Sequence, residues 1–171
     1  MPIISYDYSK ISDNWQQTAI IIGNFDGVHQ GHQKLISAAK KLSEANHLPL
    51  LAMTFDPHPA SILAKRQQFL LMPLAKRLAK LAELPLSAIF IQTFSQQIAK
   101  ISAETFLSEI LINKLKAKLI IVGHDFIFGH QRRGNSAFLA SQQENFNYHF
   151  KQIQPFADET GKIYSSSLIR T

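Results

Sequence analysis

The sequence predicts an α/β fold in which a mostly parallel sheet is flanked by helices. Short apolar runs alternate along the chain with longer amphipathic segments, which is the order of strands and crossover helices. The runs are hydrophobic at successive positions, as expected of strands covered on both faces. The 171 residues suit one domain, and no internal repeat, low-complexity segment or linker divides them.

Each expected element has its own signal. The strands are expected at residues 19–22, 48–55, 88–91, 118–122 and, more weakly, 148–153, and the helices at residues 33–45, 74–84, 103–114 and 136–145. The first strand follows Thr18 and is β-branched, and the next three are mainly aliphatic. The first helix has apolar residues at helical spacing. Pro73 suits the start of the second helix, and Ser102 and Asn135 suit the N-caps of the third and fourth.

The composition excludes several classes of function. The net charge of +6 at pH 7 favours anionic ligands. The basic residues are scattered apart from Arg132 and Arg133, and no nucleic-acid motif accompanies them, so no nucleic-acid partner is expected. There is no cysteine, no signal-peptide pattern and no apolar run near the ~20 residues that span a bilayer. We therefore expect a cytoplasmic protein with no membrane partner.

Three polar segments follow expected strands, at residues 23–32, 56–59 and 123–135. Because crossovers between parallel strands are right-handed, these loops lie at the carboxyl edge of the sheet. Open α/β sheets bind their ligands at that edge. The sequence therefore predicts the functional site there.

The segment 23–32 reads Gly-Asn-Phe-Asp-Gly-Val-His-Gln-Gly-His and links a strand to a helix N-terminus, which is an anion site. His29 and His32 are spaced i, i+3 and share a face, and the small Gly31 lets a phosphate chain approach the backbone. The dinucleotide fingerprint and the phosphate-binding P-loop are both absent. The alternatives are histidines that only cap the helix or face solvent, or a zinc pair, for which no third ligand stands nearby.

The segment 164–170, Tyr-Ser-Ser-Ser-Leu-Ile-Arg, offers similar chemistry. Serine hydroxyls and N–H groups at a helix start bind phosphate, and Arg170 adds a charged fork about one turn later. The alternative is an ordinary serine-capped helix. The presence of this segment in the same chain as His29 and His32 favours a phosphate site.

These two segments resemble the (T/H)xGH and ISSTxxR-like motifs of the nucleotidylyltransferase superfamily, whose fold is Rossmann-like. Residues 54–59, Thr-Phe-Asp-Pro-His-Pro, resemble the TF(D/E)PHP motif of the bacterial FAD synthetases. Residues 122–135 resemble the VGxDFxFGxxxxGN loop of the same enzymes. Over essentially its whole length, the chain resembles the N-terminal FMN adenylyltransferase domain of the bifunctional riboflavin kinase/FAD synthetase family.

The resemblance implies the reaction FMN + ATP → FAD + pyrophosphate, with Mg²⁺. It implies three catalytic residues, which are His29, His32 and Arg170. The implied ATP-binding residues are Gly23, Asn24, Phe25, Asp26, Gly31, Ser165, Ser166 and Ser167, with Asp26 also near Mg²⁺. The implied flavin-binding residues are Phe55, His58, Asp125, Phe126, Phe128, Arg132, Arg133 and Asn135.

Several of these residues have a structural alternative. Asn24 and Asp26 are common turn residues, a phenylalanine on an apolar run usually belongs to the core, and the two arginines suit a solvated loop tip. The last motif also departs from the family. Ser167 stands for threonine and keeps the hydroxyl, whereas Leu168 stands for an arginine and removes a cation.

The resemblance covers the adenylyltransferase half of the family alone. The riboflavin kinase half, a β-barrel in the family, has no counterpart in these residues and is expected as a partner domain missing from this chain. Two rival functions remain open. One is a nucleotidylyltransferase of the same superfamily with a different phosphorylated acceptor, and the other is a flavin- or nucleotide-binding module without catalysis.

Overall fold

The computed structural model describes residues 2–56, 73–124 and 126–154. In this part of the chain six strands form one sheet in the order β1-β4-β3-β2-β5-β6, and each neighbouring pair is parallel. The strands are β1 (Ile3–Ser5), β2 (Thr18–Ile22), β3 (Leu50–Asp56), β4 (Ala88–Thr93), β5 (Ala117–Gly123) and β6 (His149–Ile153). The predicted parallel α/β sheet is confirmed.

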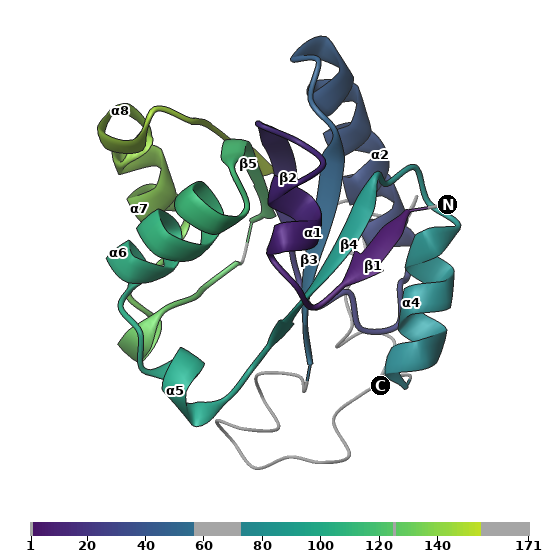
Figure 1. The fold of residues 1–171 in the computed structure, drawn as a ribbon, viewed down its shortest axis with the longest axis horizontal. Coiled ribbons are helices and arrows are strands. Elements are labelled where there is room, and N and C mark those ends of the chain that lie inside the picture. Colours follow the sequence, from purple (N-terminus) through teal and green to yellow (C-terminus); the bar gives the residue numbers. More distant parts are fainter. Residues whose placement is uncertain (1, 57–72, 125, 155–171) are drawn as a thin grey trace.

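Helices cover both faces of this sheet. In Figure 1, α2 and α4 lie on one side of the strands, and α6 and α7 lie on the other. The described helices are α1 (Ser9–Ser12), α2 (Gln30–Ala45), α4 (Leu74–Ala82), α5 (Gln96–Ala99), α6 (Ala103–Thr105), η1 (Phe106–Lys114), η2 (His130–Arg132), α7 (Ser136–Ser141) and α8 (Gln143–Phe146). None of them has both the length and the hydrophobicity of a membrane span.

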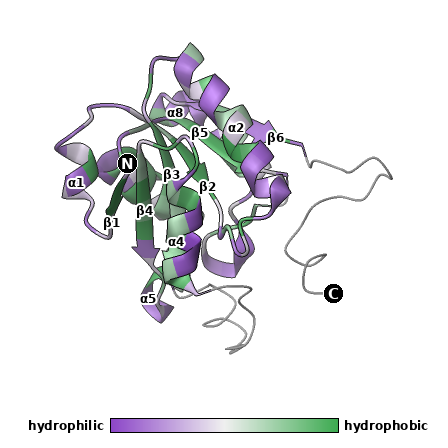
Figure 2. Ribbon diagram, turned by 90° about the vertical axis from the view of Figure 1, so that its right-hand side faces the viewer, coloured by the Kyte–Doolittle hydropathy of each residue, from purple (hydrophilic) through white to green (hydrophobic). Residues whose placement is uncertain are grey.

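The alternation of side chains along β2 divides the core into two clusters. Ile20 and Ile22 pack with α1, α6 and η1, whereas Ala19 and Ile21 pack with α2 and α4. Every residue of β2 is buried, as expected of a central strand. Figure 2 shows hydrophobic central strands and a hydrophilic β6 at the sheet edge.

The strand order reverses next to β2. Ile22 pairs with Met53 of β3 on one side and with Val122 of β5 on the other. The chain leaves β2 in one direction towards β3 and β4, and β5 and β6 lie in the other direction. The carboxyl ends of β2 and β5 therefore flank the point where the strand order reverses, which is where doubly wound sheets bind ligands.

The observed elements differ from the predicted ones at short or irregular segments. The sequence does not predict β1, α1 or α5, since three or four residues carry too little periodicity. The helix predicted at 103–114 changes from α to π winding at Phe106, and the N–H of Leu115 donates to the carbonyl of Ile110, five residues back, over 3.0 Å. The helix predicted at 136–145 breaks at Gln142, which separates α7 from α8.

Candidate functional site

The loop after β2 has an unusual backbone. Phe25, Gly27 and Val28 have φ of 54°, 86° and 42°. This left-handed region disfavours bulky side chains, so the loop stores strain at the phenylalanine and the valine. Both side chains are buried, at 1% and 3% exposure, and their burial in the core offsets the strain. A Cβ on Gly23 would lie 3.1 Å from Cζ of Phe25, which explains the glycine at that position.

Two histidines at the start of α2 hydrogen-bond to each other. The main-chain N–H of His29 donates to Nδ1 of His32 over 3.2 Å, and the main-chain N–H of His32 donates to Nδ1 of His29 over 3.3 Å. Their rings stack with centroids 3.6 Å apart. We call this arrangement the reciprocal histidine cap. Both histidines thus lie together at the N-terminus of a 16-residue helix, as their spacing predicts.

The reciprocal histidine cap determines where the imidazole protons lie. Each Nδ1 accepts a hydrogen bond, so each neutral ring carries its proton on Nε2. Burial, with a smaller contribution from nearby His29, lowers the pKa of His32 to about 3. Burial also lowers the pKa of His29, against a smaller opposite effect of Asp26. At pH 7 both rings are therefore neutral, and each carries its proton on Nε2.

Asp26 lies in the same loop and is almost completely buried, with 1% of its surface exposed. In the described part of the chain no group of three or more His, Cys, Asp or Glu residues could hold a metal ion. A zinc site built on His29 and His32 would need further protein ligands. Mg²⁺ is different, because one carboxylate together with substrate phosphates and water commonly completes its shell.

Arg77 of α4 also reaches this loop, and the sequence reasoning missed it. Its side chain is 2% exposed, and its Nη1 donates to the carbonyl of Asn24 over 3.1 Å. The spacing of Arg77 from the apolar residues of the same helix could have indicated that it is buried. Arg77 lies three residues after Leu74 and four before Leu81, on the face of α4 that packs on the sheet.

The loop after β5 holds two aromatic rings against each other. The N–H of Phe128 donates to the carbonyl of Gly134 over 3.1 Å, and the N–H of Gly134 donates back over 2.8 Å. Phe126 stacks on Phe128 with centroids 5.4 Å apart. Phe126 is half-buried and Phe128 is buried, so Phe126 is the ring with more surface open to a ligand.

The other predicted flavin-binding residues of the described part lie in three kinds of surroundings. Phe55 is 6% exposed and packs edge-on against Phe94, within the same core cluster as Phe128. Arg132 and Arg133 are exposed on their loop. The side chain of Asn135 caps α7, since its Oδ1 accepts from the N–H of Phe138 over 2.8 Å.

The remaining predicted site residues fall outside the described part of the chain. They are His58, Asp125, Ser165, Ser166, Ser167 and Arg170.

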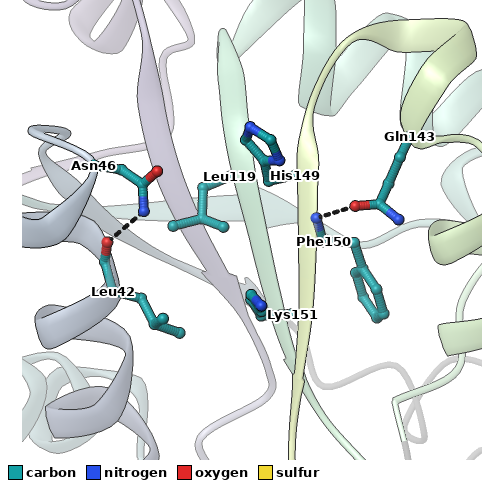
Figure 3. Close-up of a pocket in the computed structure, with 7 residues that line it drawn as sticks. All are labelled: Leu42, Asn46, Leu119, Gln143, His149, Phe150 and Lys151. Carbon is teal, nitrogen blue, oxygen red and sulfur yellow. Dashed lines mark hydrogen bonds between the residues drawn. The ribbon is translucent and has the colours of Figure 1, made fainter.

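A hollow of about 200 Å³ lies elsewhere on the molecule (Figure 3). Its lining residues are Leu42, Asn46, Leu119, Gln143, His149, Phe150 and Lys151. Leu42 lies near the end of α2, roughly 20 Å along the helix from His29. The amides of Asn46 and Gln143 already bond to main-chain groups. The hollow is therefore separate from the loops at the carboxyl edge.

Comparison with known proteins shows the family to which the chain belongs. Residues 11–167 match the family described as FAD synthetase. The chain is 35% identical over 150 residues to the bifunctional riboflavin kinase/FMN adenylyltransferase of Buchnera aphidicola subsp. Schizaphis graminum, covering 87% of this chain and 46% of that protein. It is 32% identical over 152 residues to the Escherichia coli K12 protein of the same name, covering 88% and 48%. The chain thus spans about half the length of the curated relatives it matches.

Solved structures with the same fold carry other names. A Streptococcus pneumoniae protein described as a macrolide-efflux protein has a TM-score of 0.78 and 28% identity, and the match covers 99% of this chain and 55% of that one. A Francisella tularensis pantoate-beta-alanine ligase has a TM-score of 0.68 at 15% identity, covering 100% of this chain and 74% of that one. The second likeness concerns the fold alone. The family match extends through β2, the histidine loop and β5, and on that basis the chain belongs to the FAD synthetase family.

Proposed function

We propose that the chain transfers the adenylyl group of ATP to FMN, giving FAD and pyrophosphate. The observation that carries this proposal is the pair of neutral histidines stacked at the N-terminus of α2, next to the reversal of strand order. Membership of the FAD synthetase family supports the choice of FMN as acceptor.

The reaction needs no covalent enzyme intermediate. A phosphate oxygen of FMN attacks the α-phosphorus of ATP and forms the new P–O bond. The bond from that phosphorus to the oxygen bridging the β-phosphate breaks, and pyrophosphate leaves with the electron pair. Because the FMN phosphate is already a nucleophile, the protein has to align the two phosphates and stabilise the charge that develops on them.

His29 and His32 supply that stabilisation through their Nε2–H groups. A neutral imidazole donates a hydrogen bond to a phosphate oxygen without forming an ion pair. Release of the product therefore has no ion pair to break. The dipole of α2 adds a second source of stabilisation at the same place. Of the residues predicted from sequence, Gly23, Asn24, Phe25, Asp26, Gly31, Ser165, Ser166, Ser167 and Arg170 complete the ATP site in this proposal.

The flavin lies, in this proposal, against the loop after β5. Phe126 offers a half-buried aromatic surface to the broad isoalloxazine ring. The exposed guanidinium groups of Arg132 and Arg133 suit the FMN phosphate. Phe55, His58, Asp125, Phe128 and Asn135 form the rest of the proposed flavin site.

The proposal includes Mg²⁺, which offsets the charge of the triphosphate when it is bound. The donor chemistry fits an ion that arrives with the nucleotide, since the buried Asp26 is one carboxylate and the phosphates supply further oxygen ligands. The relatives' second named activity, riboflavin kinase, we place outside these 171 residues, with the whole chain forming the adenylyltransferase domain.

A chromatographic assay with FMN, ATP and Mg²⁺ tests the proposal. We expect FAD and pyrophosphate in equal amounts, loss of the reaction in excess chelator, and no FMN from riboflavin and ATP. Adenylylation of a different phosphorylated acceptor instead of FMN would favour another transferase of the superfamily. Binding of ATP and FMN without any transfer would favour the non-catalytic module.

A further inference from the structure

Arg77 is a buried cation that the proposed chemistry does not use. Its side chain is 2% exposed within the core between α4 and the sheet. Burial lowers its pKa, while Asp56, Asp26 and Tyr6 raise it by smaller amounts. A buried charge is costly unless nearby polar groups hold it, so the partners of this guanidinium indicate what it does.

In the described part of the chain, the guanidinium donates to two main-chain carbonyls at the carboxyl ends of neighbouring strands. Nη1 donates to the carbonyl of Asn24, just after β2, over 3.1 Å. Nη2 donates to the carbonyl of Phe55, at the end of β3, over 3.0 Å. The planar guanidinium suits this bridge, because its donors point in fixed directions. Arg77 thus joins the strand that leads into the histidine loop to the strand beside it.

The carbonyl of Asn24 is held twice. It accepts a second hydrogen bond from Oγ1 of Thr54, a completely buried residue of β3, over 2.9 Å. Both donors fix the peptide that connects Asn24 to Phe25. That peptide is the first one of the left-handed loop.

The loop transmits this position to the histidines. The buried ring of Phe25 meets the ring of His32 edge-on, with centroids 5.5 Å apart. His32 in turn stacks on His29 and bonds to its main chain. Phe25 and Val28 occupy strained backbone, so the bonds that hold the end of the loop add to the burial of these side chains in keeping its shape.

We propose that Arg77 is a positioning residue, which ties the ends of β2 and β3 together and thereby holds the reciprocal histidine cap in the geometry that binds the reacting phosphates. A test of this role by kcat rests on the proposed adenylyl transfer. A test by spectroscopy of the two histidines does not, because the reciprocal histidine cap exists without substrate.

The first experiment compares Arg77→Met with two matched controls. Lys80→Met removes the same charge from an exposed position of α4. Leu81→Ala weakens the same core and leaves the hydrogen bonds of Arg77 to the Asn24 and Phe55 carbonyls in place. In Arg77→Met we expect kcat for FAD formation to fall on the order of 10²-fold with little change in KM for ATP, since a misplaced catalytic group costs about that much. The two controls keep the wild-type kcat.

The second measurement records the imidazole ¹⁵N signals of His29 and His32 without substrate. In the wild type we expect both rings to show the pattern of protonated Nε2 and unprotonated Nδ1, and Arg77→Met to lose it. Arg77→Lys restores part of the kcat and of the signals. Thr54→Val, which removes the other donor to Asn24, gives a smaller loss of the same kind, and the double variant is less than additive.

The outcomes separate the two proposals. A wild type that makes no FAD overturns the proposed function, while the ¹⁵N signals still test the role of Arg77. Wild-type kcat and signals in Arg77→Met overturn the positioning role, as does an equal kcat loss in Leu81→Ala. If Arg77→Met does not fold, unchanged kcat and signals in both Arg77→Lys and Thr54→Val overturn it.

Discussion

His29 and His32 each accept the other's main-chain N–H through Nδ1, over 3.3 Å and 3.2 Å. This exchange is the same as in a serine–glutamate capping box, but it is made by two residues that titrate. One pair of side chains therefore starts the helix and also presents two Nε2–H donors. Stability and catalysis can be separated by substitutions that keep the cap and remove the donor.

His29→Asn should make that separation. The asparagine oxygen occupies the place of Nδ1 and is a favoured N-cap, so we expect the free energy of unfolding to stay within about 1 kcal/mol of the wild type. We expect kcat for FAD formation to fall on the order of 10²-fold, as when one transition-state donor is removed. ATP binding by calorimetry should weaken much less. The control is His47→Asn at an exposed helix end, and equal losses of binding and kcat in His29→Asn would contradict the role.

Stability should depend on pH through His32. Its folded-state pKa is about 3, against an ordinary value of 6.5, so between these values the unfolded chain binds more protons than the folded one. The free energy of unfolding is therefore highest above pH 6.5 and falls as the pH drops towards 3. Urea unfolding at pH 7 and pH 5 measures this fall. His32→Asn keeps a hydrogen-bond acceptor but removes the titrating group, so the fall in unfolding free energy between pH 7 and pH 5 should be smaller. An identical fall in both proteins would show that His32 is not its cause.

Gly129→Ala should destabilise the loop after β5. Gly129 has φ of 80°, and an added Cβ would lie 2.9 Å from the main-chain N and Cα of Ala103. Strain of this kind typically costs about 1–3 kcal/mol of unfolding free energy, which urea unfolding measures. Ala140→Gly, at an exposed position of α7, is the control for a glycine–alanine exchange. Wild-type stability in Gly129→Ala would mean that the contact with Ala103 yields at no cost.

Phe126→Ala should weaken FMN binding and leave ATP binding unchanged. The half-buried ring stacks on Phe128 and has surface available for the flavin. We expect about a tenfold rise in the dissociation constant for FMN, equivalent to about 1.4 kcal/mol. Phe146→Ala is the matched control, because Phe146 is also half-buried against the same core cluster. If the two variants bind FMN equally well, the flavin does not lie on Phe126.

The sequence was sufficient for the sheet and for the histidine loop because both have local signals. The strand β2 is apolar except for Thr18, and His29 and His32 are close in sequence. The short β1 has no such signal, since its position depends on pairing with β4 far along the chain. The π winding of η1 also has no local signature, because its pattern of buried residues is compatible with an α-helix as well as with a π-helix.

The role of Arg77 could not be predicted for a related reason. The two main-chain carbonyls to which it donates among the described residues lie 53 and 22 residues earlier, and any residue supplies a carbonyl. The tautomers of the two histidines were also beyond the sequence, because they depend on which ring nitrogen faces the backbone. Sequence motifs indicated which residues meet, whereas the geometry was needed to say what state they are in.

The pairing of β2 with β5 has a consequence for the synthesis of the chain. Ile20 pairs with Leu51 of β3 soon after it is made, but its other neighbour is Ile120 of β5. At about 5–20 residues per second, a ribosome needs roughly 5–20 seconds to make the intervening chain. During that interval one edge of β2, a strand that is apolar except for Thr18, lacks its native neighbour. The sheet beside β2 is completed late, so a truncated or stalled nascent chain presents an aggregation-prone edge where the finished protein has β5.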